Sequence, residues 1–313
     1  MRTELITLAT DTTPIDGAFY QPDDKPAIGS VLLFHGNRMN FLWGAPRFLP
    51  PVLTRLGYAC LAFNRRGHDI MSIRDSRQAE GAAWQMTHEA IEDNRIAARW
   101  LAQQGLPDPV VIGHSNGGML AVRHVADHPR TPGLVLLSAQ CGGTSMVRHA
   151  AAAGALDGID LDAVAETARR KVALGRGRDL MHLPGWWYVS SAESFLDRMD
   201  SLPDTLGLAP QVRCPTLYLR GDSEPADLYP AEAFARRSGG PCTVSIVDRC
   251  DHFYRGREAE VASRVADWFE STFAAARQET AVVVGKADAA SQQVSPGHEI
   301  VSSREPSTVR DAK

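Results

Sequence analysis

The sequence predicts an α/β fold: a mostly parallel β-sheet flanked by helices, with a helical cap inserted late in the chain. Short apolar runs alternate with helical patterns from about residue 28 to residue 140, which is typical of doubly wound parallel sheets. This alternation stops between 141 and 210 and resumes at 216. A serine between two glycines stands where one apolar run meets a helical pattern. These observations direct attention to the edge of the sheet where strands end.

The apolar runs are expected to be buried strands, because parallel strands covered on both faces are apolar throughout. Beyond the N-terminal part of the chain they cover 28–34, 58–63, 110–112, 134–137, 216–220 and 244–247. The helical patterns are expected at 46–56, 84–104, 116–127, 230–237 and 258–275. Gly57 and Gly105 follow two of these patterns directly and are expected to end the helices.

Residues 141–210 are expected to form the cap. This stretch holds an Ala-rich helical segment and Arg/Gly-rich turns, and it has too much helical pattern for a loose loop. It interrupts a core of residues 1–140 and 211–276. Residues 277–313 are polar and rich in proline and serine, so we predict a disordered C-terminal tail.

Composition and charge exclude several classes of protein. The chain of 313 residues carries a net charge of −4, which gives no reason to expect a nucleic-acid partner. No apolar run approaches the length of about 20 residues that a membrane span needs, and the first residues lack a signal peptide's apolar segment. Its five widely spaced cysteines predict neither a disulfide framework nor a metal cluster. A cytoplasmic location is therefore expected.

Gly113-His114-Ser115-Asn116-Gly117 is the most informative stretch of the chain. It lies between the expected strand 110–112 and the expected helix 116–127. At such a turn only glycine fits at the flanks, and the serine hydroxyl is exposed. The turn also directs the free N–H groups of the helix N-terminus toward that hydroxyl. We predict that Ser115 is a nucleophile rather than a helix-capping serine.

A serine hydroxyl needs a base that takes its proton and a third group that orients the base. His252 follows the last expected strand and precedes the last expected helix. It is therefore predicted to lie at the carboxyl edge of the sheet, where ligands bind, and to be the base. His114 is expected to be a turn residue packed against the sheet. Histidines in helical pattern, His124 among them, are expected to be solvated.

Two carboxylates compete for the third position. Glu224 lies three residues after Gly221, at the end of the expected strand 216–220, and Pro225 follows it. Asp222 is closer to the strand end and is able to hydrogen-bond the turn. The residues alone favour Glu224 and leave Asp222 open. The order serine, acid, histidine along the chain is the order expected of this architecture.

Acyl transfer passes through an oxyanion that needs fixed N–H donors. The backbone N–H of Asn116, next to the nucleophile, is one expected donor. The second is expected in the loop after the strand 28–34, where the sequence reads His35-Gly36-Asn37-Arg38. Asn37 is the first choice there and Arg38 the second.

These motifs resemble the α/β-hydrolase superfamily over about residues 1–276. The segments that carry the resemblance are His35-Gly36, Asn64-Arg65-Arg66-Gly67-His68-Asp69, Gly113-His114-Ser115-Asn116-Gly117, Gly221-Asp222-Ser223-Glu224-Pro225 and Asp251-His252-Phe253. The resemblance implies the α/β-hydrolase fold with about eight strands, of which 5–8 and 18–21 are the first two. It also implies that the insert stands at the position of a lid. It supports Glu224 as the acid, although aspartate is commoner there. The Asn-Arg-Arg-Gly form replaces the commoner Asp-x-Arg-Gly and is interpreted as a structural turn held by arginine hydrogen bonds.

The resemblance also implies a serine hydrolase without a metal or redox cofactor. The predicted activity is cleavage of a small to medium carboxylic ester or thioester through an acyl-enzyme, as in carboxylesterases. Ser115, His252 and Glu224 form the predicted catalytic triad, and the N–H groups of Asn37 and Asn116 form the oxyanion hole. The alternatives are an acyltransferase, a carbon–carbon bond hydrolase, and a ligand-binding protein without catalysis. The expected partner is a small-molecule ester, with no nucleic acid and no membrane span.

Four aromatic side chains of the cap have two interpretations. They either line an apolar substrate pocket or pack the cap onto the core. They are Trp186, Trp187, Tyr188 and Phe195.

Overall fold

The computed structural model describes residues 1–23, 25–73, 79–154, 158–183, 185 and 189–274. The chain divides into a unit of Met1–Thr272 and a second unit of Phe273–Lys313, of which Phe273 and Ala274 are described. The disordered tail predicted for 277–313 lies outside the described residues. Within the described ranges, no helix is long and apolar enough to cross a membrane.

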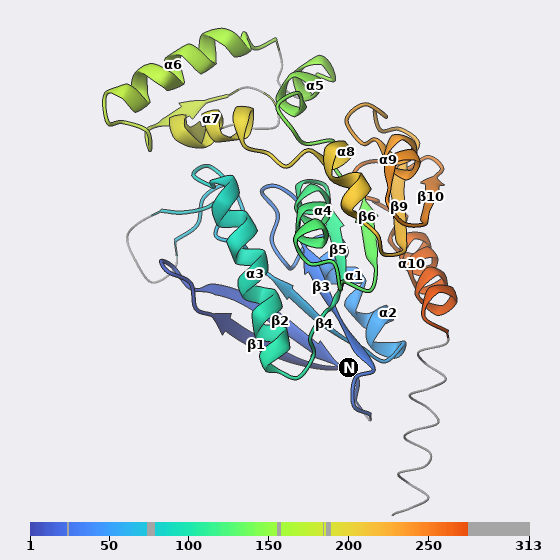
Figure 1. The fold of residues 1–313 in the computed structure, drawn as a ribbon. Coiled ribbons are helices and arrows are strands. Elements are labelled where there is room, and N and C mark those ends of the chain that lie inside the picture. Colours follow the sequence, from blue (N-terminus) through green and yellow to red (C-terminus); the bar gives the residue numbers. More distant parts are fainter. Residues whose placement is uncertain (24, 74–78, 155–157, 184, 186–188, 275–313) are drawn as a thin grey trace, which may run out of the picture. The chain divides into compact units, whose positions relative to one another are not determined.

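An eight-stranded sheet forms the centre of the first unit (Figure 1). Its strand order is β1-β2-β4-β3-β5-β6-β9-β10. The pairs β1–β2 and β2–β4 are antiparallel, and the pairs from β4 to β10 are parallel. The mostly parallel eight-stranded sheet is thereby confirmed. Its strands are β1 (Arg2–Leu8), β2 (Ile15–Gln21), β3 (Gly29–Phe34), β4 (Tyr58–Phe63), β5 (Val110–His114), β6 (Leu134–Leu137), β9 (Thr216–Gly221) and β10 (Cys242–Val247).

Helices cover both faces of this sheet, so that β4, β5 and β6 are buried along their whole length. Helices α3, α4, α8 and α9 contact one another in succession, and α1, α2 and α10 form a second group. The helices that flank the sheet are α1 (Ala45–Phe48), α2 (Pro50–Arg55), α3 (Thr87–Gln103), α4 (Asn116–Asp127), α8 (Thr205–Leu208), α9 (Ala231–Arg237) and α10 (Glu258–Thr272).

The helix predicted at 46–56 is two short helices in the structure. Helix α1 ends at Phe48 and α2 begins at Pro50. Pro50 and Pro51 lack the backbone N–H that a continuous helix would use, so they fit only at the first turn of a new helix. By contrast, the predicted helix at 116–127 and the predicted strands at 58–63 and 134–137 agree with the structure to the residue.

The elements between β6 and α8 form a separate group, which we call the insert. It contains α5 (Met146–Ala152), α6 (Leu161–Ala173), the antiparallel pair of β7 (Leu180–His182) and β8 (Val189–Ser191), and α7 (Ala192–Asp200). Phe195 of α7 is fully buried in an apolar cluster that these elements share, which agrees with the packing interpretation. Trp186, Trp187 and Tyr188 lie outside the described residues.

Helix α7 is fastened to the segment that leads into α3. Asp197 accepts hydrogen bonds from the backbone N–H of Thr87 at 2.7 Å and from its hydroxyl at 2.5 Å. The Ser194 hydroxyl donates to the Gln85 carbonyl at 2.7 Å. Because these bonds join α7 to the start of α3, the insert is held beside the first turn of α3.

His124 of α4 is buried rather than solvated, so that expectation was wrong. Its ring meets Phe34 edge-on at 5.7 Å and stacks on His128 at 4.1 Å. Helix α4 lies against the centre of the sheet, and His124 belongs to its buried face together with the apolar residues. Burial lowers the pKa of His124 to about 3, and the neighbouring His128 contributes to the shift.

We expect the buried histidines to make stability fall in weak acid. The folded-state pKa of His124 is about 3, against an ordinary value of 6.5. The unfolded chain therefore takes up a proton below pH 6.5 that the folded chain does not. The contribution of each such histidine to the free energy of unfolding is constant above that pH. It falls between about pH 6.5 and pH 3, by about 1.4 kcal/mol per pH unit.

A His124→Leu variant removes one of these contributions. Thermal unfolding at pH 7, 6, 5 and 4.5 should show a smaller loss of stability with acid in the variant than in the wild type. The comparison uses the slope with pH, so a constant packing cost of the leucine does not affect it. Identical slopes would show that His124 is protonated as readily in the folded state.

Candidate active site

Ser115 occupies a strained turn between β5 and α4. Its backbone lies at φ 58° and ψ −121°, a region that residues other than glycine seldom adopt. A Cβ on Gly113 would collide with the backbone of Gly117. A Cβ on Gly117 would collide with the carbonyl oxygens of Phe34 and His35. The turn therefore needs both glycines, and it packs directly against the end of β3.

The structure brings together the three side chains proposed for catalysis. His252 Nε2 lies 2.9 Å from Ser115 Oγ, and His252 Nδ1 lies 2.6 Å from Glu224 Oε1. A carboxylate accepts hydrogen bonds, so the Nδ1 proton points to Glu224. Nε2 then carries the lone pair that accepts the serine proton. All three come from the ends of strands β5, β9 and β10 or from the turns that follow them.

The second oxygen of Glu224 is held from two sides. Oε2 accepts a hydrogen bond from the backbone N–H of Gly221 at 2.7 Å and from the Ser138 hydroxyl at 2.6 Å. The Tyr254 hydroxyl lies 2.6 Å from Ser138 Oγ. Since Ser138 gives its proton to the carboxylate, Tyr254 is the donor in that contact. Burial raises the pKa of Tyr254 well above its ordinary value, with the charge of Glu224 adding to the shift, so its proton is retained.

Sequence reasoning did not find Ser138 or Tyr254. Ser138 directly follows β6, so it stands at the same sheet edge as the other site residues. Tyr254 comes two residues after His252. A search of every polar side chain that follows a strand would have included Ser138.

Asp222 does not contact the imidazole of His252. Its carboxylate accepts hydrogen bonds from the backbone N–H groups of Arg249 at 2.9 Å and Cys250 at 3.1 Å. These bonds, the one from Arg249 first, lower the pKa of the exposed Asp222 carboxyl. Asp222 thus braces the turn that carries His252, while Glu224 meets the ring.

His114 also stabilises the turn that carries His252. Its Nε2 lies 2.8 Å from the backbone carbonyl of His252, so that nitrogen carries the proton and donates. Burial, together with the nearby His252, lowers the pKa of His114 to about 3. A neutral imidazole therefore fixes the His252 backbone without adding a charge to the site.

The loop after β3 is fixed by the Asn64-Arg65-Arg66-Gly67 turn. The fully buried Arg65 donates from Nη2 to the carbonyl of His35 at 2.6 Å, and its backbone N–H donates to His35 Nε2 at 3.1 Å. Arg66 is bonded twice to Asp93, through its backbone N–H and its Nε. These bonds agree with the interpretation of this turn as a structural one.

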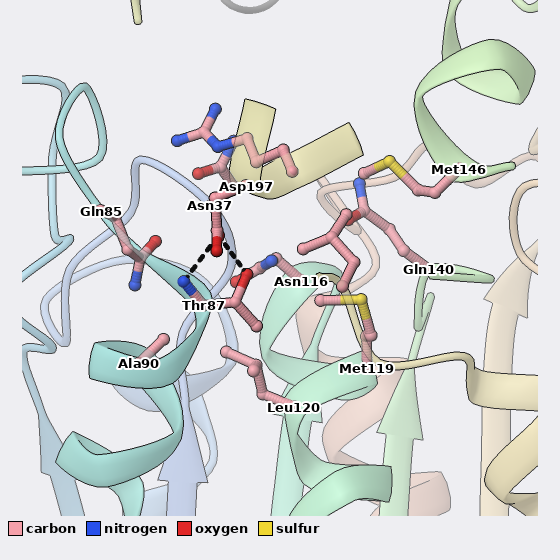
Figure 2. A pocket seen from close by; sticks show the side chains of 12 residues that line it. Asn37, Gln85, Thr87, Ala90, Asn116, Met119, Leu120, Gln140, Met146 and Asp197 are labelled. Carbon is pink, nitrogen blue, oxygen red and sulfur yellow. Dashed lines mark hydrogen bonds between the residues drawn. The ribbon is translucent and has the colours of Figure 1, made fainter. Parts of the chain in front are cut away.

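Asn37 and Asn116, the two residues proposed as oxyanion donors, line one small cavity (Figure 2). The cavity measures about 20 Å³, which is room for roughly one water. Thr87 and Asp197, joined by the dashed hydrogen bonds in Figure 2, line it as well. Arg38, the second choice for the donor, lines a different space. Asn37 therefore shares a cavity with Asn116, and Arg38 does not.

Strained backbone is concentrated at this site. Seven residues other than glycine have positive φ in the described part of the chain. Five of them belong to the turns around Ser115 and His252, and such strain persists where the surrounding structure imposes it. These five are Arg38, Ser115, Ser138, Arg249 and Tyr254.

Residues 31–265 match the model of a family described as "Alpha/beta hydrolase family". The chain belongs to the alpha/beta hydrolase family. No curated protein sequence matches this alpha/beta hydrolase.

Solved structures with the same fold include two esterases and a dienelactone hydrolase. Est1E from Butyrivibrio proteoclasticus is 17% identical with a TM-score of 0.60, over 86% of this chain and 99% of that one. The esterase domain of a Rhodothermus marinus protein is 20% identical with a TM-score of 0.57, over 87% and 99%. Dienelactone hydrolase from Anabaena variabilis is 16% identical with a TM-score of 0.54, over 86% and 97%. At these identities the likeness is one of fold.

We expect Gly113→Ala to be far more harmful than Gly105→Ala. Gly105 has a φ of +79° with open space around it, so alanine there costs only the strain of a left-handed backbone, about 1–2 kcal/mol. At Gly113 the methyl group collides with the backbone of α4, and about 3 kcal/mol or more is expected because the helix must shift.

Urea unfolding of both variants measures this difference. The Gly105→Ala variant should keep the wild-type activity, and the Gly113→Ala variant, where it folds at all, should lose it because Ser115 moves. Equal losses of stability in the two variants would contradict the close contact between β5 and α4.

Proposed function

We propose that this protein is a serine hydrolase that cleaves a carboxylic ester of a small to medium substrate. One observation carries the proposal: Ser115, His252 and Glu224 form an unbroken series of hydrogen bonds at the carboxyl edge of the sheet. This arrangement has the groups that acyl transfer needs, namely a nucleophile, a base and an orienting carboxylate. A structure of Est1E with bound ferulic acid agrees with a small-molecule substrate.

In the first half of the proposed reaction, Ser115 Oγ attacks the ester carbonyl carbon. His252 Nε2 takes the serine proton as the new C–O bond forms. The tetrahedral intermediate collapses when the bond to the alcohol oxygen breaks, and His252 returns the proton to that oxygen. The products of this half are the free alcohol and an acyl group on Ser115.

In the second half, water takes the place of the alcohol. His252 removes a proton from the water, whose oxygen attacks the acyl carbon. The bond to Ser115 Oγ then breaks, the proton passes to Oγ, and the carboxylic acid leaves. Glu224 stabilises the imidazolium that forms in both halves and keeps Nε2 directed at the serine.

The proposed oxyanion donors are the backbone N–H groups of Asn37 and Asn116. Asn116 is the first residue of α4, where N–H groups have no helical partner. Donors of this kind are fixed before the reaction begins, and each typically supplies about 3 kcal/mol of transition-state stabilisation.

For the insert, we propose the role of a lid over this edge of the sheet, because α7 carries Asp197, which lines the same cavity as Asn37.

The Ser115→Ala variant tests the nucleophile. It lacks the attacking oxygen, so hydrolysis of p-nitrophenyl acetate should fall at least about a thousandfold, while thermal unfolding stays close to that of the wild type. The wild type should also be labelled at Ser115 by a fluorophosphonate probe. Unchanged turnover in the variant would disprove the assignment, and a wild type without labelling or turnover would indicate a ligand-binding protein.

Glu224→Gln and Asp222→Asn separate the two carboxylates. Glutamine cannot stabilise the imidazolium and can present an N–H to the ring, so kcat should fall by about a thousandfold or more. Asparagine keeps one of the two oxygens that accept from the N–H groups of Arg249 and Cys250, so it loosens the turn that carries His252 without removing a group from the ring, and kcat should fall by no more than about tenfold. The assignment of the acid is wrong if the Asp222 variant is the crippled one and the Glu224 variant is not.

A further inference from the structure

An open groove of about 1060 Å³ lies beside the loop that follows β3. Its lining includes four large apolar side chains that are exposed to solvent: Leu42, Trp43, Met71 and Phe253. Trp43, the largest, is 64% exposed. Single exposed apolar residues are common on protein surfaces, but a contiguous group around a concave space marks a binding surface.

The loop that presents Leu42 and Trp43 is braced by polar contacts. The amide of Asn40 donates to Asp69 at 2.9 Å, and its oxygen accepts from the backbone N–H of Leu42 at 2.9 Å. Asn64 accepts from the backbone N–H of Phe41 at 3.0 Å. These bonds fix the loop backbone, so the exposed apolar pair belongs to a built surface.

The groove adjoins the proposed catalytic residues at two points. Phe253, on one wall, follows His252 directly, and the two rings meet edge-on at 5.1 Å. Met39, which also lines the groove, lies near the turn of Ser115. Its Sδ is 2.8 Å from the position that a Cβ on Gly36 would take, and Ser115 Cβ is 3.3 Å from that same position.

Met39 lines the groove and lies close to the turn of Ser115. Its Cε reaches to 2.9 Å from the position of a Cβ on Gly44, which lines the groove. The side chain therefore extends from the surroundings of Ser115 to the groove. A methionine has three rotatable bonds and adapts to what it contacts, so this side chain is able to change its rotamer when a group binds beside it.

The sizes of the two spaces decide where a large substrate group fits. The cavity beside Asn37 and Asn116 measures about 20 Å³ and holds roughly one water. The groove, at about 1060 Å³, is as large as the sites that bind drug-sized ligands. Within the described part of the chain, Ser115 itself lines neither space.

We propose that the groove binds the apolar chain of the ester substrate, with Leu42, Trp43 and Phe253 as its contacts and Met39 as its movable inner wall. The proposal rests on the serine hydrolase function above and adds a substrate class to it: esters that carry an extended apolar group. The small cavity then receives no part of the substrate larger than the oxyanion.

Two series of esters test the proposal and identify which side of the ester enters the groove. In the first, p-nitrophenyl acetate, butyrate, hexanoate and octanoate vary the acyl chain. In the second, ethyl, butyl, hexyl and octyl acetates vary the alcohol. A fully buried methylene gives about a fourfold gain, so kcat/KM should rise at least about tenfold along one of the series.

The Leu42→Ala/Trp43→Ala variant should lose most of that rise. Its kcat/KM should fall less for ethyl acetate than for the longest ester of the series that responds, because the ester with two short chains reaches the two side chains least. The matched control is Leu174→Ala, which removes a leucine that is 72% exposed at the end of α6, outside the groove. The control should keep the wild-type dependence on chain length.

A flat dependence on chain length in both series, with normal turnover of p-nitrophenyl acetate, would overturn the groove proposal and leave the hydrolase function intact. Absence of p-nitrophenyl acetate turnover in the wild-type protein would instead contradict the function itself.

Size-exclusion chromatography tests whether the groove instead binds a second copy of the chain. If the double variant changes from dimer to monomer while its chain-length dependence is unchanged, the groove binds a second copy of the chain and the proposal is wrong.

Discussion

The close approach of the first turn of α4 to the sheet is the constraint on which the site depends. Glycine at 113, 117 and 118 lets this turn touch the backbone of β5, the end of β3 and the start of the segment after β6. One helix N-terminus therefore lies against three strand ends. Ser115 gains its strained backbone from this contact, and Asn116 is brought to the same cavity as Asn37.

Neutral groups support the charged ones in this site. Glu224 is only 7% exposed, and a buried carboxylate is costly unless hydrogen bonds replace its water. Gly221, Ser138 and His252 supply three. His114 and Tyr254 add bonds in a second layer, and burial keeps both of them neutral. In surroundings of low polarity such bonds are strong and hold one geometry.

Local patterns predicted the strands, most helices and the turn around Ser115, because glycines, prolines and apolar runs act on their own neighbourhood. Contacts between distant residues had no such signal. Ser138 meets Glu224 across 86 positions and Tyr254 across 116, and His124 is buried only because α4 lies at the centre of the sheet. The groove was equally hidden, since an apolar residue in a loop looks the same in the sequence whether it is buried or exposed.

The hydrogen bond between Asp197 and Thr87 joins two residues that leave the ribosome at very different times. The residue before α3 is Met86, which has no side-chain oxygen for the N–H of Thr87, and the acceptor comes from 110 positions later. During translation the N–H and hydroxyl of Thr87 therefore lack their Asp197 acceptor until α7 has left the ribosome. A nascent chain that ends before the insert carries Ser115 but lacks Asp197 and Arg198, which line the cavity beside Asn37 and Asn116.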